Sequence, residues 1–205
     1  MKENDSLFLG FYKETDGIFR LQVPFDGLYT SVFLIEATAG AFLVDCGTTK
    51  ADVDEILLPA LAVRGYRAKD LAGIVLSHRH DDHAGGLPYL LEAFPALRVV
   101  DEVTSLCEGV STYPLSGHTP DSLGVLDART GTLITGDGLQ FDGVNQYPRT
   151  VRDGAGYFAT LDRIEADERV ENMLFSHAYN PWKRDGVRGR SEVLAAVALC
   201  KELTK

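Results

Sequence analysis

The sequence predicts an α/β fold (α+β in arrangement) in which two β-sheets pack face to face and helices cover the outside. Short apolar runs broken by Gly and Asp turns occupy residues 6–45, and a second group of such runs occupies residues 110–136. Each group is followed by segments with apolar residues at helical spacing, so the order is β-rich, α, β-rich, α. Because a sheet must bury its apolar face, two facing sheets flanked by helices suit this order.

The first half is expected to form a meander of strands followed by helices. Strands are predicted over residues 6–12, 17–23, 30–37 and 40–45. A helix is predicted over 49–66, where apolar side chains recur at helical spacing, and Pro59 is expected to kink or split it. A buried strand, a short helix and another strand are predicted over 71–77, 86–94 and 97–100.

The second half returns to strands and closes with helices. Strands are predicted over 110–116, 122–128, 131–136 and 172–176. A long polar loop is expected over 138–155, followed by helices over 156–167 and 191–203. Ser191 is the residue expected to cap the last helix.

Bulk composition limits the classes of function. A chain of 205 residues is most simply one domain, residues 1–205, and its formal charge of −10 disfavours a nucleic-acid partner. No run approaches the roughly eighteen apolar residues that span a bilayer, and the N-terminus is too charged for a signal peptide, so no membrane partner and a cytoplasmic location are expected. The cysteines Cys46, Cys107 and Cys200 form no CxxC pair, which argues against a disulfide framework and a thiolate zinc site.

Side chains that can bind metal follow the predicted strands at their ends. His78, His118, Asp137 and His177 each come directly after an apolar run that ends in a small residue, and Asp45 ends a fifth run. Strand ends that share one edge can bring such side chains together, and rigid strands hold them accurately. The sequence therefore predicts a polar site at one edge of the sheets.

The segment "HRHDDH" over residues 78–83 concentrates three of the chain's five histidines. An extended backbone would point His78 and His80 the same way, with Asp82 continuing that register and His83 facing away unless the chain turns. Residues 84–86, Ala-Gly-Gly, are expected to supply a flexible turn. Without a cation, this concentration of imidazoles and carboxylates would be costly, so the segment predicts a metal site, and its two pairs of ligands indicate two metals.

These motifs resemble those of the metallo-β-lactamase-fold hydrolase superfamily. The resemblance rests on the HxHxDH segment, the "GHTP" and "TGD" motifs that contain His118 and Asp137, the late "SH" pair that contains His177, and the early "DCG" element that begins at Asp45. It implies a four-layer αββα sandwich of two mixed β-sheets flanked by helices.

The resemblance also implies a dinuclear metal centre. One metal would be held by His78, His80 and His118, and the other by Asp82, His83 and His177. Asp137 would bridge the two, and Asp45 would support a metal-binding histidine from behind. Zn²⁺ suits nitrogen and oxygen ligands, although Fe or Mn fit almost as well. Two such ions roughly 3.5–4 Å apart would share a nucleophilic hydroxide, with Asp82 as the candidate proton shuttle.

Candidate substrate-binding residues lie in three segments near the predicted ligands. The substrate is expected to be a small molecule, and Arg149 or Arg152 could receive a carboxylate from it. A homodimer through an exposed apolar face is also considered. The candidate substrate-binding residues are Phe25, Tyr29, Phe141, Tyr147, Arg149, Arg152 and Tyr179.

Four readings of the function compete. The first is hydrolysis of an ester, thioester or lactone by the dinuclear centre. A mononuclear iron persulfide dioxygenase and a small phosphoester hydrolase on the same fold are the enzymatic alternatives. A non-enzymatic metal-binding scaffold is disfavoured because all seven ligands of the motif are retained, and RNA cleavage is disfavoured by the acidic charge.

Overall fold

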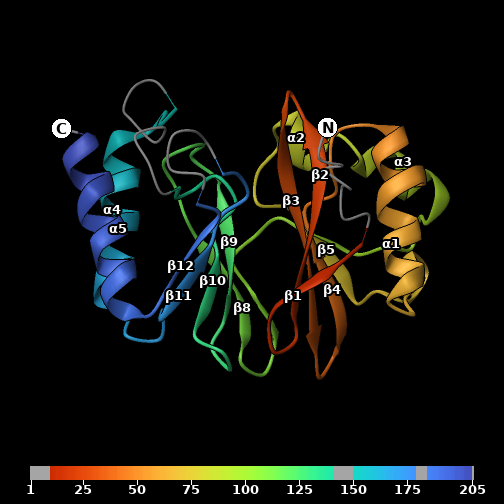
Figure 1. Ribbon diagram of the computed structural model, residues 1–205, viewed down its shortest axis with the longest axis horizontal. Coiled ribbons are helices and arrows are strands. Elements are labelled where there is room, and N and C mark those ends of the chain that lie inside the picture. The colour runs from red at the N-terminus through yellow and green to blue at the C-terminus, as the bar shows by residue number, and fades with distance from the viewer. Residues whose placement is uncertain (1–9, 141–149, 179–183, 205) are drawn as a thin grey trace, which may run out of the picture.

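The computed structural model describes residues 10–140, 150–178 and 184–204, and its strands form two facing sheets of six strands each. Figure 1 shows helices on both outer faces: α4 and α5 cover one sheet, and α1 and α3 cover the other. The predicted four-layer αββα sandwich is confirmed, and both sheets are mixed.

The first sheet contains six strands in sequence order. They are β1 (Tyr12–Thr15), β2 (Ile18–Phe25), β3 (Leu28–Ala37), β4 (Gly40–Val44), β5 (Gly73–Val75) and β6 (Val99–Val100). The first four strands pair antiparallel, β5 pairs in parallel with β4, and β6 pairs in parallel with β5. Asp26 and Gly27 join β2 to β3 with φ of 43° and 76°, the pair of positive angles that a tight two-residue hairpin requires. The first strand was predicted over residues 6–12, but β1 begins at Tyr12, and residues 10–11 are not part of it.

The second sheet contains the other six strands. In chain order they are β7 (Ser105–Cys107), β8 (Val110–Pro114), β9 (Leu123–Asp127), β10 (Thr132–Ile134), β11 (Asn172–Leu174) and β12 (Gly186–Arg188). The edge strands β7 and β12 were not predicted. Each is three residues long and mostly polar or small, so neither shows the apolar alternation on which the prediction depends.

Five of the seven helical segments in the described residues lie where helices were predicted, whereas the short segments at residues 68–70 and 81–84 were not predicted. They are η1 (Asp52–Leu57), α1 (Leu58–Val63), η2 (Ala68–Asp70), α2 (Asp81–Ala84), α3 (Leu87–Ala93), α4 (Gly154–Ala166) and α5 (Arg190–Leu203). The helix predicted over 49–66 changes from π-helical geometry in η1 to α-helical geometry in α1 just before Pro59, where a kink or split was expected. The Ser191 cap is wrong: Gly189 precedes α5 at φ 86°, so Ser191 is already inside the helix.

Apolar side chains form three layers. On β3, Val32 and Leu34 pack toward η1 and α1, whereas Phe33 and Ile35 face the second sheet. A third cluster fills the space between the second sheet and helices α4 and α5. This period-two alternation, with both faces of β3 buried, explains why its sequence is almost continuously apolar. Among the helices of the described residues, none has the length and apolar character needed to cross a membrane.

Candidate metal centre

Strand ends from both sheets bring the predicted ligands together. His78 follows β5, His118 follows β8, Asp137 follows β10 and His177 follows β11. Their ligand atoms, together with those of the "HRHDDH" segment, form three overlapping groups, each with all its ligand atoms within 4.8 Å of one another. Strands that lie far apart in the sequence thus contribute to one site.

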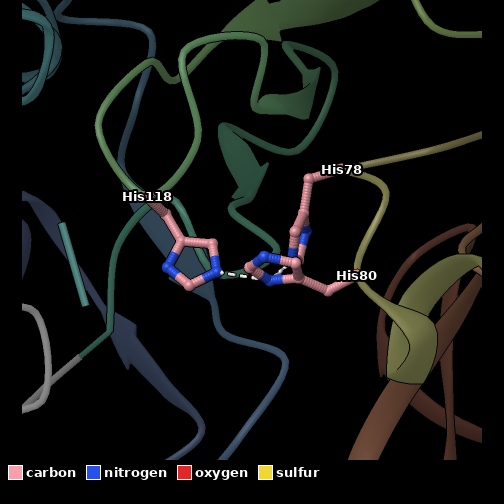
Figure 2. Close-up of side chains that lie close together, drawn as sticks. All are labelled: His78, His80 and His118. Atoms are coloured by element: carbon pink, nitrogen blue, oxygen red, sulfur yellow. Dashed lines mark hydrogen bonds between the residues drawn. The ribbon is translucent and has the colours of Figure 1, made fainter. Parts of the chain in front are cut away.

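The first group contains His78, His80 and His118. The Nε2 atoms of His78 and His118 lie 2.9 and 3.0 Å from Nδ1 of His80. Figure 2 shows the three rings converging, with His78 and His80 on one segment and His118 on another. Three imidazole nitrogens that face one point suit a transition-metal cation.

The second group contains Asp82, His83 and His177, all of which are buried. Oδ2 of Asp82 lies 3.2 Å from Nε2 of His83 and 3.3 Å from Nε2 of His177. The same oxygen accepts a hydrogen bond of 3.1 Å from the hydroxyl of Thr30 on β3. This group therefore draws its ligands from both sheets.

Asp137 lies between these two groups, with one carboxylate oxygen toward each, and forms the third group with His78 and His83. Its Oδ2 is 3.6 Å from Nε2 of His118, and its Oδ1 is 3.4 and 3.2 Å from Nε2 of His83 and His177. Oδ1 of Asp137 and Nε2 of His83 are buried, and neither makes a hydrogen bond within the part of the chain that the structure describes. Buried polar atoms of this kind are costly unless they bind a ligand, so the residues fit a cation that both groups share.

The register argument assumed that the "HRHDDH" segment is extended, but the segment is not extended beyond His80. Residues from Asp81 to Ala84 form the helical turn α2, and the carbonyl of His80 accepts hydrogen bonds from the amides of His83 and Ala84. These hydrogen bonds between near neighbours form a helical turn, so the alternation of side chains expected for a strand ends at His80. The turn places Asp82 and His83 as neighbours in the second group, while His80 remains in the first.

Gly85 and Gly86 serve close packing rather than the predicted flexibility. A Cβ at Gly85 would overlap the carbonyl oxygen of Thr48, and one at Gly86 would overlap that of Cys46 and lie 2.8 Å from Val53. The loop after β4 thus contacts the backbone that follows α2. Only glycine allows this approach.

Polar partners fix the rings of the second group from behind. Nδ1 of His83 lies 2.7 Å from Oδ2 of Asp45, whose carboxylate also accepts hydrogen bonds of 2.8 Å from the amide and hydroxyl of Ser77. Nδ1 of His177 lies 2.8 Å from the carbonyl oxygen of Tyr29. When Nδ1 donates a proton, Nε2 is left to bind a metal, so these contacts orient both rings for coordination.

The same arrangement recurs in the first group, with residues that the sequence did not reveal. Nδ1 of His118 lies 2.8 Å from the carbonyl oxygen of Thr150, and Nδ1 of His78 lies 3.1 Å from the hydroxyl of Ser77. Thr30 is likewise absent from the sequence prediction. Only Ser77 left a sequence signal, because a serine precedes the ligand histidine in both "SH" motifs.

The electrostatics of the site divide its histidines into two classes. Burial disfavours the charged form of His177, but the nearby carboxylates of Asp137 and Asp82 outweigh it and raise the pKa of His177 to about 9. Burial is likewise outweighed at His83, where Asp137 and Asp45 raise the pKa well above its usual value. By contrast, burial and the neighbouring His83 lower the pKa of His78 to about 2. Without metal, protons on His83 and His177 balance the carboxylates.

These shifts predict that the metal-free protein is most stable near pH 6.5. The raised pKa values of His83 and His177 contribute stability that is present below pH 6.5, their ordinary value, and is lost as the pH rises toward 9. The lowered pKa values of His78 and His118 contribute stability that is present above pH 6.5 and is lost as the pH falls. Thermal melts of chelator-treated protein from pH 5 to 9.5 measure this.

Bound Zn²⁺ should abolish the loss of stability that the metal-free protein shows above pH 6.5. A cation replaces the protons on His83 and His177, so the melting temperature of the loaded protein should no longer fall between pH 6.5 and 9. A metal-free melting temperature that rises steadily over this interval would contradict the assignment of the protons to these two rings.

The chain is similar to known proteins in sequence and in fold. The sequence profile of the metallo-beta-lactamase superfamily matches residues 25–105. The solved structure of the DIM-1 metallo-beta-lactamase superimposes with a TM-score of 0.71 at 16% identity, over 95% of this chain and 97% of that one. The protein has the metallo-β-lactamase fold. A second superfamily structure, a metallo-beta-lactamase family protein from Thermus thermophilus, gives a TM-score of 0.67 at 16% identity over 93% of this chain and 80% of that one.

Relatives of this metallo-β-lactamase-fold protein carry different names. The uncharacterized protein YobT of Bacillus subtilis is 26% identical over 56% of this chain and 70% of its own length. The atrochrysone carboxyl ACP thioesterase of Aspergillus fumigatus is 24% identical over 67% of this chain, and the hydroxyacylglutathione hydrolase of Stenotrophomonas maltophilia is 41% identical over 34%. The matches span 47% and 24% of those two enzymes' own lengths.

The candidate substrate-binding residues lie in different surroundings. Phe25 is half-buried at the β2–β3 hairpin, and its ring centroid lies 6.3 Å from that of His177. Tyr29 turns its hydroxyl to Asp185, to which it donates a hydrogen bond of 2.8 Å. Arg152 is exposed at the start of α4, beside Phe158 and Thr204. Four further candidates lie outside the described residues: Phe141, Tyr147, Arg149 and Tyr179.

Proposed function

We propose that this metallo-β-lactamase-fold protein is a metal-dependent hydrolase that uses two divalent cations to cleave an ester, thioester or lactone of a small molecule. The observation that carries the proposal is the position of Asp137, which directs one oxygen toward His118 and the other toward His83 and His177. A carboxylate between two groups of ligands suits a bridge between two cations.

We propose Zn²⁺ as the cation at both positions. The proposed ligands are five imidazoles and two carboxylates: His78, His80, Asp82, His83, His118, Asp137 and His177. No thiolate takes part, since the buried Cys46 directs its thiol to the carbonyl of His83. Nitrogen and oxygen donors of this kind suit Zn²⁺. Fe and Mn accept the same donors, so metal analysis must decide among them.

The chain's own residues have separate roles in the proposed reaction. Bound cations would supply a water molecule that is nucleophilic at neutral pH and would stabilise the oxyanion that forms on the substrate. Asp82 is the proposed proton shuttle to the leaving group, and Thr30 holds it in place by a hydrogen bond to Oδ2. Phe25 offers an apolar surface beside His177 for the non-polar part of the substrate.

One observation supports a thioester or related acyl substrate, and a second supports a small molecule in general. The matched regions of a thioesterase and a hydroxyacylglutathione hydrolase are similar to this chain. The chain's formal charge of −10 favours a small molecule over a nucleic acid, although a ribonuclease J of Mycobacterium tuberculosis also matches at 28% identity over 49% of this chain. The cytoplasmic location and the homodimer considered from the sequence remain predictions.

A small substrate panel tests the proposed reaction. Protein purified without added metal is first analysed for its metal content, then loaded with Zn²⁺ and assayed on a thioester, a lactone, a phosphodiester and glutathione persulfide. We expect two equivalents of metal and turnover of the thioester or the lactone. One equivalent of iron with oxygen uptake on the persulfide would contradict the proposal and favour a dioxygenase, and turnover of the phosphodiester alone would favour a phosphoester hydrolase.

A further inference from the structure

Arg20 is a fully buried arginine on the face of β2 that looks toward the second sheet. It lies two residues after the core residue Ile18, where alternation predicts an apolar side chain, and its guanidinium carbon is 4.6 Å from the ring centroid of Phe33. A buried guanidinium costs free energy unless its donors and its charge are satisfied. Glu14 accepts a hydrogen bond of 2.5 Å from Nε, and the carboxylate of Asp185 is 3.6 Å from Nη1.

Two further hydrogen bonds of Arg20 reach the backbone on both sides of His177. Nη1 donates to the carbonyl oxygen of Phe175 at 2.7 Å, and Nη2 donates to that of Asp185 at 2.8 Å. Phe175 follows β11 and Asp185 precedes β12, so the guanidinium holds both ends of the segment that carries His177. One side chain of the first sheet therefore fixes a loop of the second.

Ser31 on β3 strengthens this connection. Its hydroxyl accepts a hydrogen bond of 2.7 Å from Nη1 of Arg20 and donates one of 2.9 Å to the carbonyl oxygen of Ser176. The amide of Ser31 donates to the same oxygen at 2.9 Å. Ser176 is the residue immediately before His177, so these contacts end one residue from a proposed ligand.

The second ligand group depends on how the two sheets are positioned at this edge. Asp82 and His83 belong to the first sheet's side, where Thr30 and Asp45 hold them, whereas His177 comes from the second sheet. In the described residues, the first ligand group makes no hydrogen bond or ion pair with Arg20. A shift of the segment held by Arg20 would therefore move His177 away from Asp82 and leave His78 and His80 in place.

We infer that Arg20 is a positioning residue for the second cation of the proposed dinuclear centre. This inference rests on the proposed function, because it requires two cations. Arg20 does not touch the ligands; it fixes the carbonyls on both sides of His177 and so sets the distance across which Asp82, His83 and His177 share a cation. Loss of such supporting contacts typically weakens metal binding about 10–100-fold.

Arg129 provides a matched control at the other end of the sandwich. It lies in the turn between β9 and β10, pairs with the buried Asp127 and donates a hydrogen bond of 2.9 Å to the carbonyl oxygen of Glu36, near the end of β3 in the first sheet. Arg129 thus also connects the two sheets through a backbone carbonyl. Within the described residues, it makes no hydrogen bond or ion pair with the segment that carries His177.

The test is a Zn²⁺ titration with chelator competition on the wild type, Arg20→Met, Arg20→Lys, Ser31→Ala and Arg129→Met. Melting temperatures without metal are measured in parallel. We expect Arg20→Met to bind the first equivalent as the wild type does and the second about 10–100-fold more weakly. Arg20→Lys and Ser31→Ala should weaken the second equivalent less, and they allow the test if Arg20→Met does not fold. Arg129→Met should lower the melting temperature and leave both affinities unchanged.

The outcomes separate this inference from the proposed function. Two equivalents in the wild type and an unchanged second affinity in the folded Arg20 and Ser31 variants would overturn the inference alone. Equal weakening of both equivalents, or the same change in Arg129→Met, would also overturn it, because Arg20 would then act only through general stability. Fewer than two equivalents in the wild type would overturn the two-cation proposal and this inference with it.

Discussion

Asp137→Ala is expected to remove both cations and abolish hydrolysis. The carboxylate faces both ligand groups, so its loss takes one oxygen from each and leaves Asp82 as the carboxylate beside both His83 and His177. We expect Zn²⁺ affinity to fall more than about 100-fold at both positions, since a direct ligand should matter more than a supporting contact. Dialysis against a chelator followed by metal analysis measures this.

Asp81→Ala is the matched control for this variant. Asp81 is also a carboxylate, and it adjoins two proposed ligands in the sequence, but its side chain is exposed and takes no part in the three groups. It should bind two equivalents and keep its activity. If Asp137→Ala retained two tightly bound cations and full turnover, the bridging role of Asp137 would be wrong.

Gly85→Ala is expected to lower the free energy of unfolding by about 3 kcal/mol, near the upper end of overpacking effects. The added methyl group would overlap the carbonyl oxygen of Thr48, which is backbone and cannot rotate away. Relief requires the turn α2 to move away from the loop after β4, and this would also displace His83 from Asp45. Urea denaturation of the metal-free protein measures the loss, and a Zn²⁺ titration should show weaker binding.

Gly10→Ala is the control, because no atom of the described residues lies within 4 Å of a Cβ at that position and its φ is not positive. It should change the free energy of unfolding by less than about 0.5 kcal/mol. A Gly85→Ala protein as stable as Gly10→Ala would show that the close approach of the two backbones is not required.

The layers of the fold could be predicted because its strands have strong local patterns. The almost continuous apolar run of β3 and the glycine-containing turns on either side of it are visible in a single sequence. His118, Asp137 and His177 could be assigned to one site because each follows a strand directly, and strand ends meet at an edge. Local pattern was sufficient for these features.

Features that depend on distant backbone could not be predicted in the same way. The buried guanidinium of Arg20 donates a hydrogen bond to the carbonyl oxygen of Phe175, which lies 155 residues later in the sequence. The carbonyl of Tyr29 orients His177 across 148 residues, although the side chain of Tyr29 had suggested a role in substrate binding. The helical turn at Asp82 follows from local backbone hydrogen bonds that a strand register does not anticipate. Such contacts have no signature in periodicity or composition.

Anomalous scattering at the zinc edge from crystals of the Zn²⁺-loaded protein tests the central claim most directly. Two peaks are expected: one among His78, His80 and His118, and one among Asp82, His83 and His177. Asp137 should contact both. A peak at neither group, or a single peak that leaves the second group empty at saturating Zn²⁺, would contradict the proposed dinuclear centre.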